Sequence, residues 1–211
     1  MYVPPKFAMT PDETAAALAA AGFAHLVSHT PDGLIVTPLP LMYDPATHAL
    51  IGHVARANPH ALAAGAESVA TFAGPQAYVS PGFYATKAET GKVVPTWNYD
   101  VLAVSGRLVV HDDPDWVLDL VTRLTARHEG GRDQPWQVSD APEPFVAGQL
   151  KAIVGVSLPV DRVEGKAKMS QNQPDRNRDG VVDGLTGTGD VAVAERVRDI
   201  QRGSTNANGR G

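Results

Sequence analysis

Residues 23–41, which read FAHLVSHTPDGLIVTPLPL, decide the fold class of this chain. The segments 23–29 and 34–41 are rich in apolar and β-branched residues, and Pro31-Asp32-Gly33 between them is a typical turn. The stretch therefore predicts a β-hairpin. Pro38 and Pro40 cannot donate backbone hydrogen bonds to a neighbouring strand, so the second strand is expected at a sheet edge or at a rim that faces a ligand.

Further short strands are predicted from the same composition and from the turn residues that separate them. They are residues 50–54, 68–72, 76–80, 97–110 and 153–158. Gly74-Pro75 is expected to link two of these strands. Gly106 is expected to form a bulge or a point of close approach in the long strand.

Helices are predicted between these strands and near the end of the chain. Thr10 and Glu13 form a capping box for a first helix that Gly22 ends, and Asn58-Pro59 begins a second helix that ends at Gly65. Apolar spacing predicts two more, over 115–129 and 191–200, and a disordered tail from Gly203. Six or seven short strands interrupted by capping helices favour a closed or split barrel, mainly β with α, over a doubly wound parallel sheet.

Composition limits the class of protein and its partners. The 211 residues include no cysteine, which excludes disulfides and cysteine-type zinc sites and agrees with a reducing compartment. The first residues lack the apolar core of a signal peptide, and no stretch approaches the roughly 18 apolar residues of a membrane span. We therefore expect a cytoplasmic protein without a membrane segment. The net charge of −5 offers no general attraction to nucleic acid.

Residues 52–60, GHVARANPH, carry a predicted strand through an arginine-containing turn into a helix start. Backbone N–H groups and the helix dipole at such a start favour an anion, and Arg56 could add two charge-assisted hydrogen bonds. This pattern suits a phosphate. The alternative is a solvated Arg56 beside an ordinary Asn58 cap, because most helix starts bind only water.

Residues 87–99, KAETGKVVPTWNY, form a polar loop that delivers aromatic residues and an amide at a strand start. Trp97 and Tyr99 alternate with Asn98 along an extended chain, so one face could offer rings for stacking and Asn98 a hydrogen-bonding amide. Such groups suit a flat ligand. The alternative is that Trp97 plugs a barrel and the loop only decorates the surface.

Two other patterns are weaker. Residues 175–180 imitate the start of an EF-hand loop, but Thr186 stands where that loop needs a bidentate Glu. Gly184, Gly187 and Gly189 do not follow a strand and lack the spacing of a dinucleotide motif, so we expect a flexible turn there. We predict no metal site, and without a nucleophile motif we assign no catalytic residue.

Several blocks together resemble the PaiB-type family of FMN-binding negative transcriptional regulators over roughly residues 1–185. They are residues 1–5, 53–60, 78–81, 87–99, and Glu164-Gly165-Lys166 leading to Ser170-Gln171-Asn172. The resemblance implies the FMN-binding split β-barrel of pyridoxamine-phosphate oxidases and flavin reductases over residues 1–185. Residues 186–211 then form a C-terminal helix and tail. It also implies FMN as the cofactor and a homodimer with flavin sites between the subunits.

The same resemblance assigns cofactor-binding residues. It places Thr37, Pro38 and Leu39 beside the isoalloxazine ring, and His53, Arg56 and Asn58 near the ribityl phosphate. Trp97, Asn98 and Tyr99 would approach from the dimer side, and Lys168 lies in the late block of the site. This block departs from the family at Ala167 and Gln173, where an aromatic and an arginine are usual. If that aromatic covers the ligand, Ala167 leaves a wider or wetter pocket.

Two classes of function follow from the resemblance. In the first, flavin occupancy or redox state controls a dimer that lowers expression of other genes, with DNA as a partner only by family resemblance. In the second, the flavin serves a reductase or oxidase that acts on a small substrate. A flavin store or sensor is a third, non-catalytic alternative. Whether the chain is an enzyme stays open at this point.

Overall fold

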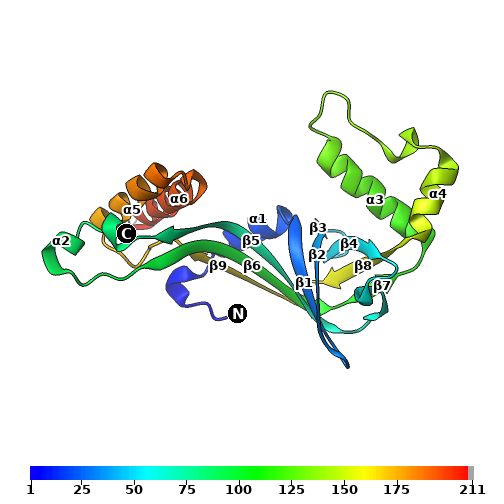
Figure 1. Ribbon diagram of the computed structural model, residues 1–211, viewed down its shortest axis with the longest axis horizontal. Coiled ribbons are helices and arrows are strands. Elements are labelled where there is room, and N and C mark those ends of the chain that lie inside the picture. The colour runs from blue at the N-terminus through cyan, green and yellow to red at the C-terminus, as the bar shows by residue number, and fades with distance from the viewer. Residues whose placement is uncertain (209–211) are drawn as a thin grey trace. The chain divides into compact units, whose positions relative to one another are not determined.

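The computed structural model describes residues 1–208, with side chains through residue 203. In this part of the chain nine strands and six α-helices follow one another, coloured from blue to red in Figure 1. The strands are β1 (Phe23–Thr30), β2 (Gly33–Pro40), β3 (Met42–Asp44), β4 (Ala49–Ala55), β5 (Glu67–Val79), β6 (Thr96–Arg107), β7 (Val109–His111), β8 (Ile153–Pro159) and β9 (Arg162–Lys168). The α-helices are α1 (Pro11–Ala19), α2 (Lys87–Thr90), α3 (Pro114–Glu129), α4 (Glu143–Lys151), α5 (Asp175–Thr188) and α6 (Val191–Asn208). Short 3-10 turns are η1 (Pro5–Phe7), η2 (Pro59–Leu62), η3 (Pro81–Phe83) and η4 (Val138–Asp140).

The chain folds into two compact units, each built from segments that are far apart in the sequence. Unit 1 comprises residues 1–14, 73–102 and 164–211, and unit 2 comprises residues 15–72 and 103–163. The domain boundary expected at residue 185 falls inside unit 1, within α5. The expected single domain over residues 1–185 stays a prediction.

Unit 2 contains the predicted hairpin as β1 and β2. The strands are antiparallel, with Phe23 opposite Pro40, and β1 also pairs with β5. Strand β2 ends the strand order β2-β1-β5-β6-β9, which confirms the edge position predicted from its prolines. One face of β2 is buried through Leu39, whereas Leu34 and Val36 on the other face are 69% and 58% exposed.

A second sheet of unit 2 has the order β3-β4-β8-β7, and α3 packs on it. The helix begins where the Asp113 side chain accepts a hydrogen bond from the backbone N–H of Asp115, and Pro114 fits its first turn. Its apolar residues recur at helical spacing, as predicted for 115–129. Leu120 and Leu124 are buried against sheet residues Met42, Ala49 and Ile51.

Two glycines let backbone segments of unit 2 approach closely. A Cβ at Gly155 would lie 2.1 Å from the Trp116 ring, so the indole fills the space above β8 that a side chain would need. The Trp116 ring also stacks on His111, with ring centroids 3.8 Å apart. A Cβ at Gly106 would lie 2.0 Å from the Pro159 carbonyl oxygen, which confirms Gly106 as a point of close approach.

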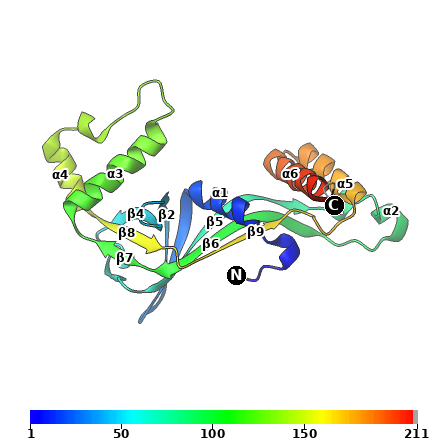
Figure 2. The same cartoon turned by 180° about the vertical axis from the view of Figure 1, so that it is seen from behind.

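Unit 1 has its own apolar core between strands and the two C-terminal helices. Helices α5 and α6 lie side by side, as Figures 1 and 2 show from opposite directions. The fully or nearly fully buried side chains of this core include Val79, Met169, Val181, Leu185 and Val197. The predicted apolar stripe of the terminal helix therefore faces a core.

A partly buried ion network ties three segments of unit 1 together. The Arg196 Nε donates to Asp100 Oδ2 at 2.7 Å, and its Nη2 donates to Glu13 Oε1 at 2.9 Å. Burial raises the pKa of Asp100, although Arg196 opposes this by favouring the ionised carboxylate. The capping box predicted at Thr10 and Glu13 is present, with both reciprocal hydrogen bonds formed.

Several predicted elements differ from the structure. The segments 68–72 and 76–80 belong to one continuous strand, β5, so Gly74-Pro75 does not form a link between strands. The helix predicted from Asn58 to Gly65 is only the 3-10 turn η2. Helix α4 and strand β9 were not predicted, because the segments 130–152 and 160–168 lack a long apolar period.

The flexible turn predicted around Gly184 and Gly187 is instead part of α5, and Gly189 caps that helix in the left-handed conformation. A Cβ at Gly180 would lie 2.1 Å from the Phe83 carbonyl oxygen, and one at Gly184 would lie 2.3 Å from the Phe83 ring. These glycines therefore serve close packing of the helix on η3 rather than flexibility.

The end of the chain is helical further than expected, because α6 continues past Gly203 to Asn208. The remainder of the predicted tail, residues 209–211, lies outside the described residues. In the described part of the chain, no helix combines the length and apolar character that crossing a bilayer requires. The cytoplasmic location stays a prediction.

We expect Gly106→Ala to lower the free energy of unfolding by about 3 kcal/mol, because the new methyl group meets backbone that cannot move independently. Gly148→Ala in α4 is the matched control, since a Cβ there meets nothing within 4 Å. The control should raise stability by up to about 1 kcal/mol through helix propensity. Urea unfolding measures both, and equal stability of the two variants would contradict the close-approach role of Gly106.

Candidate functional site

A polar network in unit 2 joins the edge strand β2 to the turn η2. Thr37 Oγ1 lies 2.8 Å from His60 Nδ1 and 3.2 Å from Asn58 Oδ1, and Asn58 Nδ2 donates to Thr37 Oγ1 at 3.1 Å. Asn58 Oδ1 also accepts the backbone N–H of His60 at 2.9 Å. The structure therefore brings two predicted site residues, Thr37 and Asn58, into direct contact, with His60 bonded to both.

His60 is the residue of this network that sequence reasoning missed. It is fully buried, and its Nε2 has no hydrogen-bond partner. Burial lowers the pKa of His60, which favours the neutral imidazole. The available signal was its position two residues after the Asn58 cap, where a histidine interrupts an alanine-rich run.

The other predicted residues of β2 divide between its two faces. Leu39 is 3% exposed on the same face as Thr37, whereas Pro38 is exposed on the opposite face. Successive side chains of a strand point to opposite sides, so only Thr37 and Leu39 can face one ligand from this strand.

His53 lies in the middle of β4, opposite Gly155 of β8. Its Nδ1 is buried without a hydrogen-bond partner, and burial lowers the pKa of the ring. By strand alternation His53 shares a face with Ile51, which packs against α3. It is therefore a neutral group with an unused buried nitrogen.

Arg56 occupies the turn after β4, as predicted, but its guanidinium is held by protein groups. It donates to both carboxylate oxygens of Asp112, at 2.6 and 2.9 Å, and to the carbonyl oxygens of Lys151 and Ile153, at 2.9 and 3.2 Å. The hydrogen bonds with Asp112 raise the pKa of Arg56 and lower that of Asp112. A phosphate at Arg56 would have to displace Asp112 or share the guanidinium with it.

The expected helix dipole is not available to assist Arg56. The turn η2 has only four residues, and the Asn58 side chain already accepts from the His60 N–H group. The helix-start part of the phosphate prediction is therefore wrong, because the chain makes one 3-10 turn instead of a helix. The contact between Arg56 and the phosphate itself stays a prediction.

Unit 1 carries the second group of predicted residues. Trp97 is 53% exposed and meets Tyr78 edge to face, with ring centroids 6.2 Å apart. Asn98 is fully buried, and both ends of its amide lie 3.1 Å from the hydroxyl of Ser170. Trp97 thus offers an open ring, whereas the Asn98 amide is occupied inside the unit.

Lysines of β9 surround the aromatic residues of unit 1. Lys168 Nζ donates to Thr96 Oγ1 at 2.5 Å and to the Trp97 carbonyl oxygen at 2.6 Å. Burial lowers the pKa of Lys168, and the neighbouring charge of Lys166 lowers it further. The Lys166 and Lys168 ammonium groups lie 5.3 and 6.0 Å from the Tyr99 ring centroid, within cation–π range.

Each unit offers its own groups to a ligand. Unit 2 supplies buried imidazole nitrogens and a hydroxyl. Unit 1 supplies the exposed ring of Trp97 and two ammonium groups near Tyr99. Among the described residues, no three His, Cys, Asp or Glu side chains are placed to hold a metal ion.

Comparison with known proteins agrees with this chemistry. Residues 1–162 match the family described as "Putative FMN-binding domain". An uncharacterized protein of Aspergillus fumigatus is 35% identical over 170 residues, which cover 72% of this chain and 65% of that protein, just under two thirds of its length. The Bacillus subtilis protein named "Protease synthase and sporulation protein PAI 2" is 27% identical over 190 residues, which cover 88% of this chain and 89% of the other.

A solved structure shows the fold. The FAD and heme binding protein of Mycobacterium smegmatis superposes with a TM-score of 0.59 at 16% identity, covering 85% of this chain and 80% of the other. The chain thus has the flavin-binding split-barrel fold that the sequence resemblance implied. Because the family model matches most of its length, the chain belongs to the PaiB-type family of FMN-binding proteins, and its cofactor is FMN.

Proposed function

We propose that this chain is an FMN-dependent regulator of gene expression that acts as a homodimer. The observation that carries the proposal is the alignment with the Bacillus subtilis protein, which spans nearly the whole of both chains and whose name refers to protease synthase and sporulation. When bound, FMN supplies a ring system that accepts and donates electrons. Its occupancy or redox state would be the signal that the dimer reads.

The residues of unit 2 fit part of FMN. The unpartnered nitrogens of His53 and His60 are buried polar atoms that a ligand could satisfy, since buried polar groups are rarely left without a partner. Thr37, held by Asn58 and His60, would present its hydroxyl at a fixed position. Arg56 would meet the phosphate by exchanging Asp112 for it, because guanidinium pairs with either anion in the same two-pronged geometry.

The residues of unit 1 fit the rest of the cofactor. Trp97 would stack on the isoalloxazine ring, and Lys168, which sits against the Trp97 carbonyl, would fix the direction from which the indole approaches. Asn98 would act by positioning, through its hydrogen bonds to Ser170 below the Trp97–Tyr99 segment. In this proposal, residues of the neighbouring subunit complete each flavin site.

The outer face of the β1–β2 hairpin supports the homodimer. Phe23, Leu34 and Val36 are 66%, 69% and 58% exposed on this face, and Val36 stands opposite Val27. An exposed apolar sheet face at an edge strand is a liability for a protein unless a partner covers it. A second copy would cover it by a symmetric contact, the commonest arrangement in homodimers.

We expect wild-type protein to have twice the chain mass in light scattering and Val36→Glu to have the mass of one chain. The reason is that a carboxylate at a covered apolar face loses its hydration without gaining a partner. Leu62→Glu is the matched control, because Leu62 is 91% exposed in η2, outside the hairpin, and this variant should remain dimeric. A wild-type monomer that binds FMN with full affinity would contradict the proposal.

We expect Arg56→Ala to weaken FMN binding about tenfold and to leave riboflavin binding unchanged, because only FMN carries the phosphate. Asp112→Asn should strengthen FMN binding, because it removes the anion that competes for Arg56. Arg107→Ala is the matched control, since Arg107 is also an exposed arginine of unit 2 paired with a carboxylate, Glu67. Titration of both flavins measures these effects, and equal losses for FMN and riboflavin would remove Arg56 from the site.

For the regulatory role, we expect deletion of the gene to raise the levels of a defined set of transcripts. Re-expression of the wild-type protein should restore the original levels. Re-expression of a variant that cannot bind FMN should not. Direct DNA binding by the purified protein should be weak and unselective at about 0.15 M salt, because the chain carries a net charge of −5. Unchanged transcripts together with flavin turnover by a nicotinamide donor would favour an oxidoreductase. Tight retention of one DNA fragment would show direct repression instead of repression through a partner.

A further inference from the structure

Helix α3 has a second row of residues, part apolar and part polar, on a side that does not pack on the sheet. Val117, Leu120 and Leu124 bury one side of the helix in the core. Leu118, Thr122, Thr125, Ala126 and Glu129 recur at the same helical spacing along a different side and border a cavity of about 700 Å³. This volume lies within the range of about 300–1,000 Å³ that is typical of small-molecule sites.

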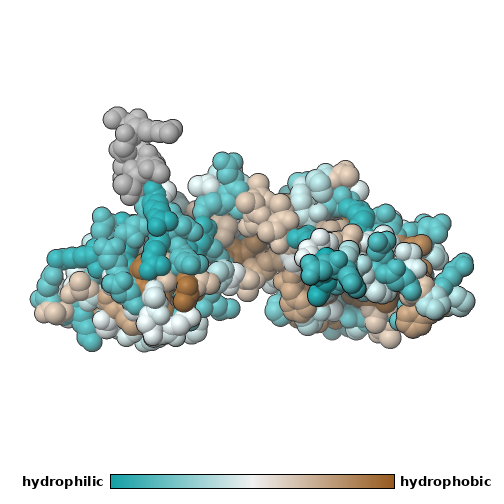
Figure 3. Space-filling model, turned by 90° about the horizontal axis from the view of Figure 1, so that it is seen from above, coloured by the Kyte–Doolittle hydropathy of each residue, from teal (hydrophilic) through white to brown (hydrophobic). Residues whose placement is uncertain are grey.

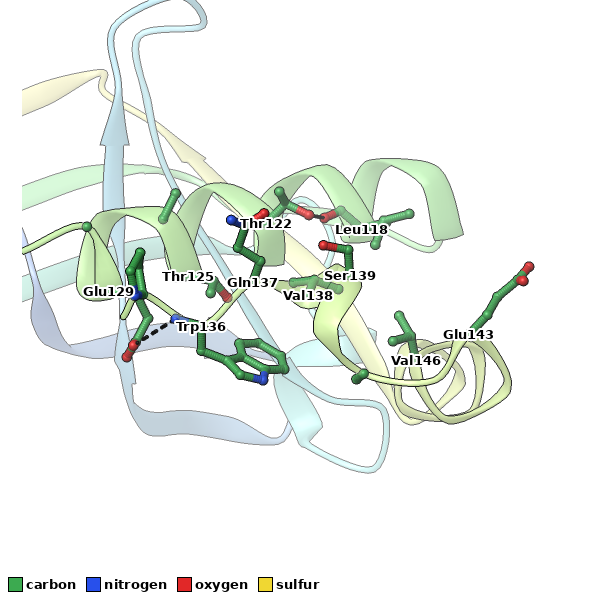
Figure 4. A pocket seen from close by; sticks show the side chains of 14 residues that line it. Leu118, Thr122, Thr125, Glu129, Trp136, Gln137, Val138, Ser139, Glu143 and Val146 are labelled. Atoms are coloured by element: carbon green, nitrogen blue, oxygen red, sulfur yellow. Dashed lines mark hydrogen bonds between the residues drawn. The ribbon is translucent and has the colours of Figure 1, made fainter. Parts of the chain in front are cut away.

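The cavity lies between α3, the connection after it, and α4. Figure 4 shows α3 as one wall and the chain through Trp136, Val138 and Ser139 as another, with Val146 of α4 toward one end. All of these residues belong to unit 2. From above, Figure 3 shows the surface around α3 and α4, at the right, as a mixture of apolar and hydrophilic areas.

The walls favour an apolar ligand with an aromatic part. Trp136 is 48% exposed and is the one aromatic residue among those that line the cavity. Leu118, Val138 and Val146 supply further apolar wall. An exposed indole can stack on a flat ring or attract a cation over its face.

The charged groups that line the cavity are both carboxylates. Glu129 and Glu143 are the charged residues among those that line it, and none of the lining residues is Lys, Arg or His. Thr122 already donates its hydroxyl hydrogen to the Leu118 carbonyl oxygen at 2.7 Å, so its oxygen can only accept. A ligand with N–H donors or positive charge would match these groups, and an anion would be repelled.

Glu129 is the charged group nearest to the Trp136 main chain. One of its carboxylate oxygens accepts from the Trp136 backbone N–H at 3.3 Å, and the other pairs with Arg132 Nε at 3.0 Å. The first contact holds the carboxylate beside the segment that carries the indole. The Arg132 side chain is 66% exposed, so a ligand cation could compete with it for Glu129.

We propose that this cavity is a second ligand site, separate from the flavin site, for a small aromatic organic cation. The ring system lies against Trp136 and the apolar wall of α3, and the positive charge lies toward Glu129. FMN itself is unsuited, because its phosphate would face carboxylates and acceptor oxygens. The site does not depend on the proposed regulatory function or on Arg56.

The test is calorimetric titration of the full chain, with FMN present, using berberine as a flat aromatic cation and 1-anilinonaphthalene-8-sulfonate as an aromatic anion. We expect one berberine to bind per chain and the anion to bind at least tenfold more weakly. Glu129→Gln should weaken berberine about tenfold while keeping an acceptor for the Trp136 N–H. Arg132→Ala should strengthen it, because the competing cation is gone.

The controls separate charge at the cavity from general charge and from folding. Asp133→Asn removes a carboxylate from the same connection, outside the lining residues, and should leave berberine binding unchanged. Ala126→Phe should fill the cavity and abolish binding while FMN affinity and the unfolding temperature stay near wild type. If Ala126→Phe does not fold, the effects of Glu129→Gln and Arg132→Ala on berberine binding still test the proposal.

Three outcomes would overturn the proposal. They are absence of berberine binding, equal affinity for the cation and the anion, and equal effects of Glu129→Gln and Asp133→Asn. Loss of FMN binding alone would count against the flavin site and not against this one. Opposite effects of Glu129→Gln and Arg132→Ala on berberine, with the anion affected in the reverse direction, would establish it.

Discussion

The packing of α3 on the four-stranded sheet is the contact on which the rest of unit 2 depends. It is possible because Gly155 has no side chain, so the Trp116 ring can lie directly on β8, where it also stacks on His111. The pair is fixed further by a 2.7 Å hydrogen bond between His111 and Ser157. Interiors are packed as densely as organic crystals, so this fit allows one position for the helix.

The position of α3 affects both candidate sites of unit 2. Asp112, two residues before the helix begins, is brought beside Arg56, so the charge that would bind a phosphate is already balanced within the protein. The second row of residues on the helix becomes a wall of the second cavity. The packing of α3 on the sheet therefore determines both the charge balance at Arg56 and the shape of the second cavity.

Some polar atoms of unit 2 lose their hydrogen bonds to water on folding and gain no partner within the protein. His53 and His60 each keep a ring nitrogen without a partner, and burial lowers the pKa of both rings. Uncharged imidazoles can exchange hydrogen bonds with a heterocycle without a large cost in desolvation. In unit 1 the Asn98 amide is instead satisfied by Ser170, so that segment offers its exposed Trp97 ring to a ligand.

The sequence by itself determined the barrel class, the β1–β2 hairpin with its edge strand, α3, and the close approach at Gly106, because these depend on short-range periodicity, turn residues and missing donors. It also determined the family, through blocks of residues that recur as units. Only the tertiary structure decided that Arg56 pairs with Asp112 and Thr37 with His60, since these partners are 56 and 23 residues apart. Tertiary packing also explains two glycines of α5, because Phe83 occupies the space that side chains at Gly180 and Gly184 would fill. Local sequence patterns indicate which secondary structure a segment prefers. Tertiary packing alone determines which distant group neutralises a charge or fills a gap.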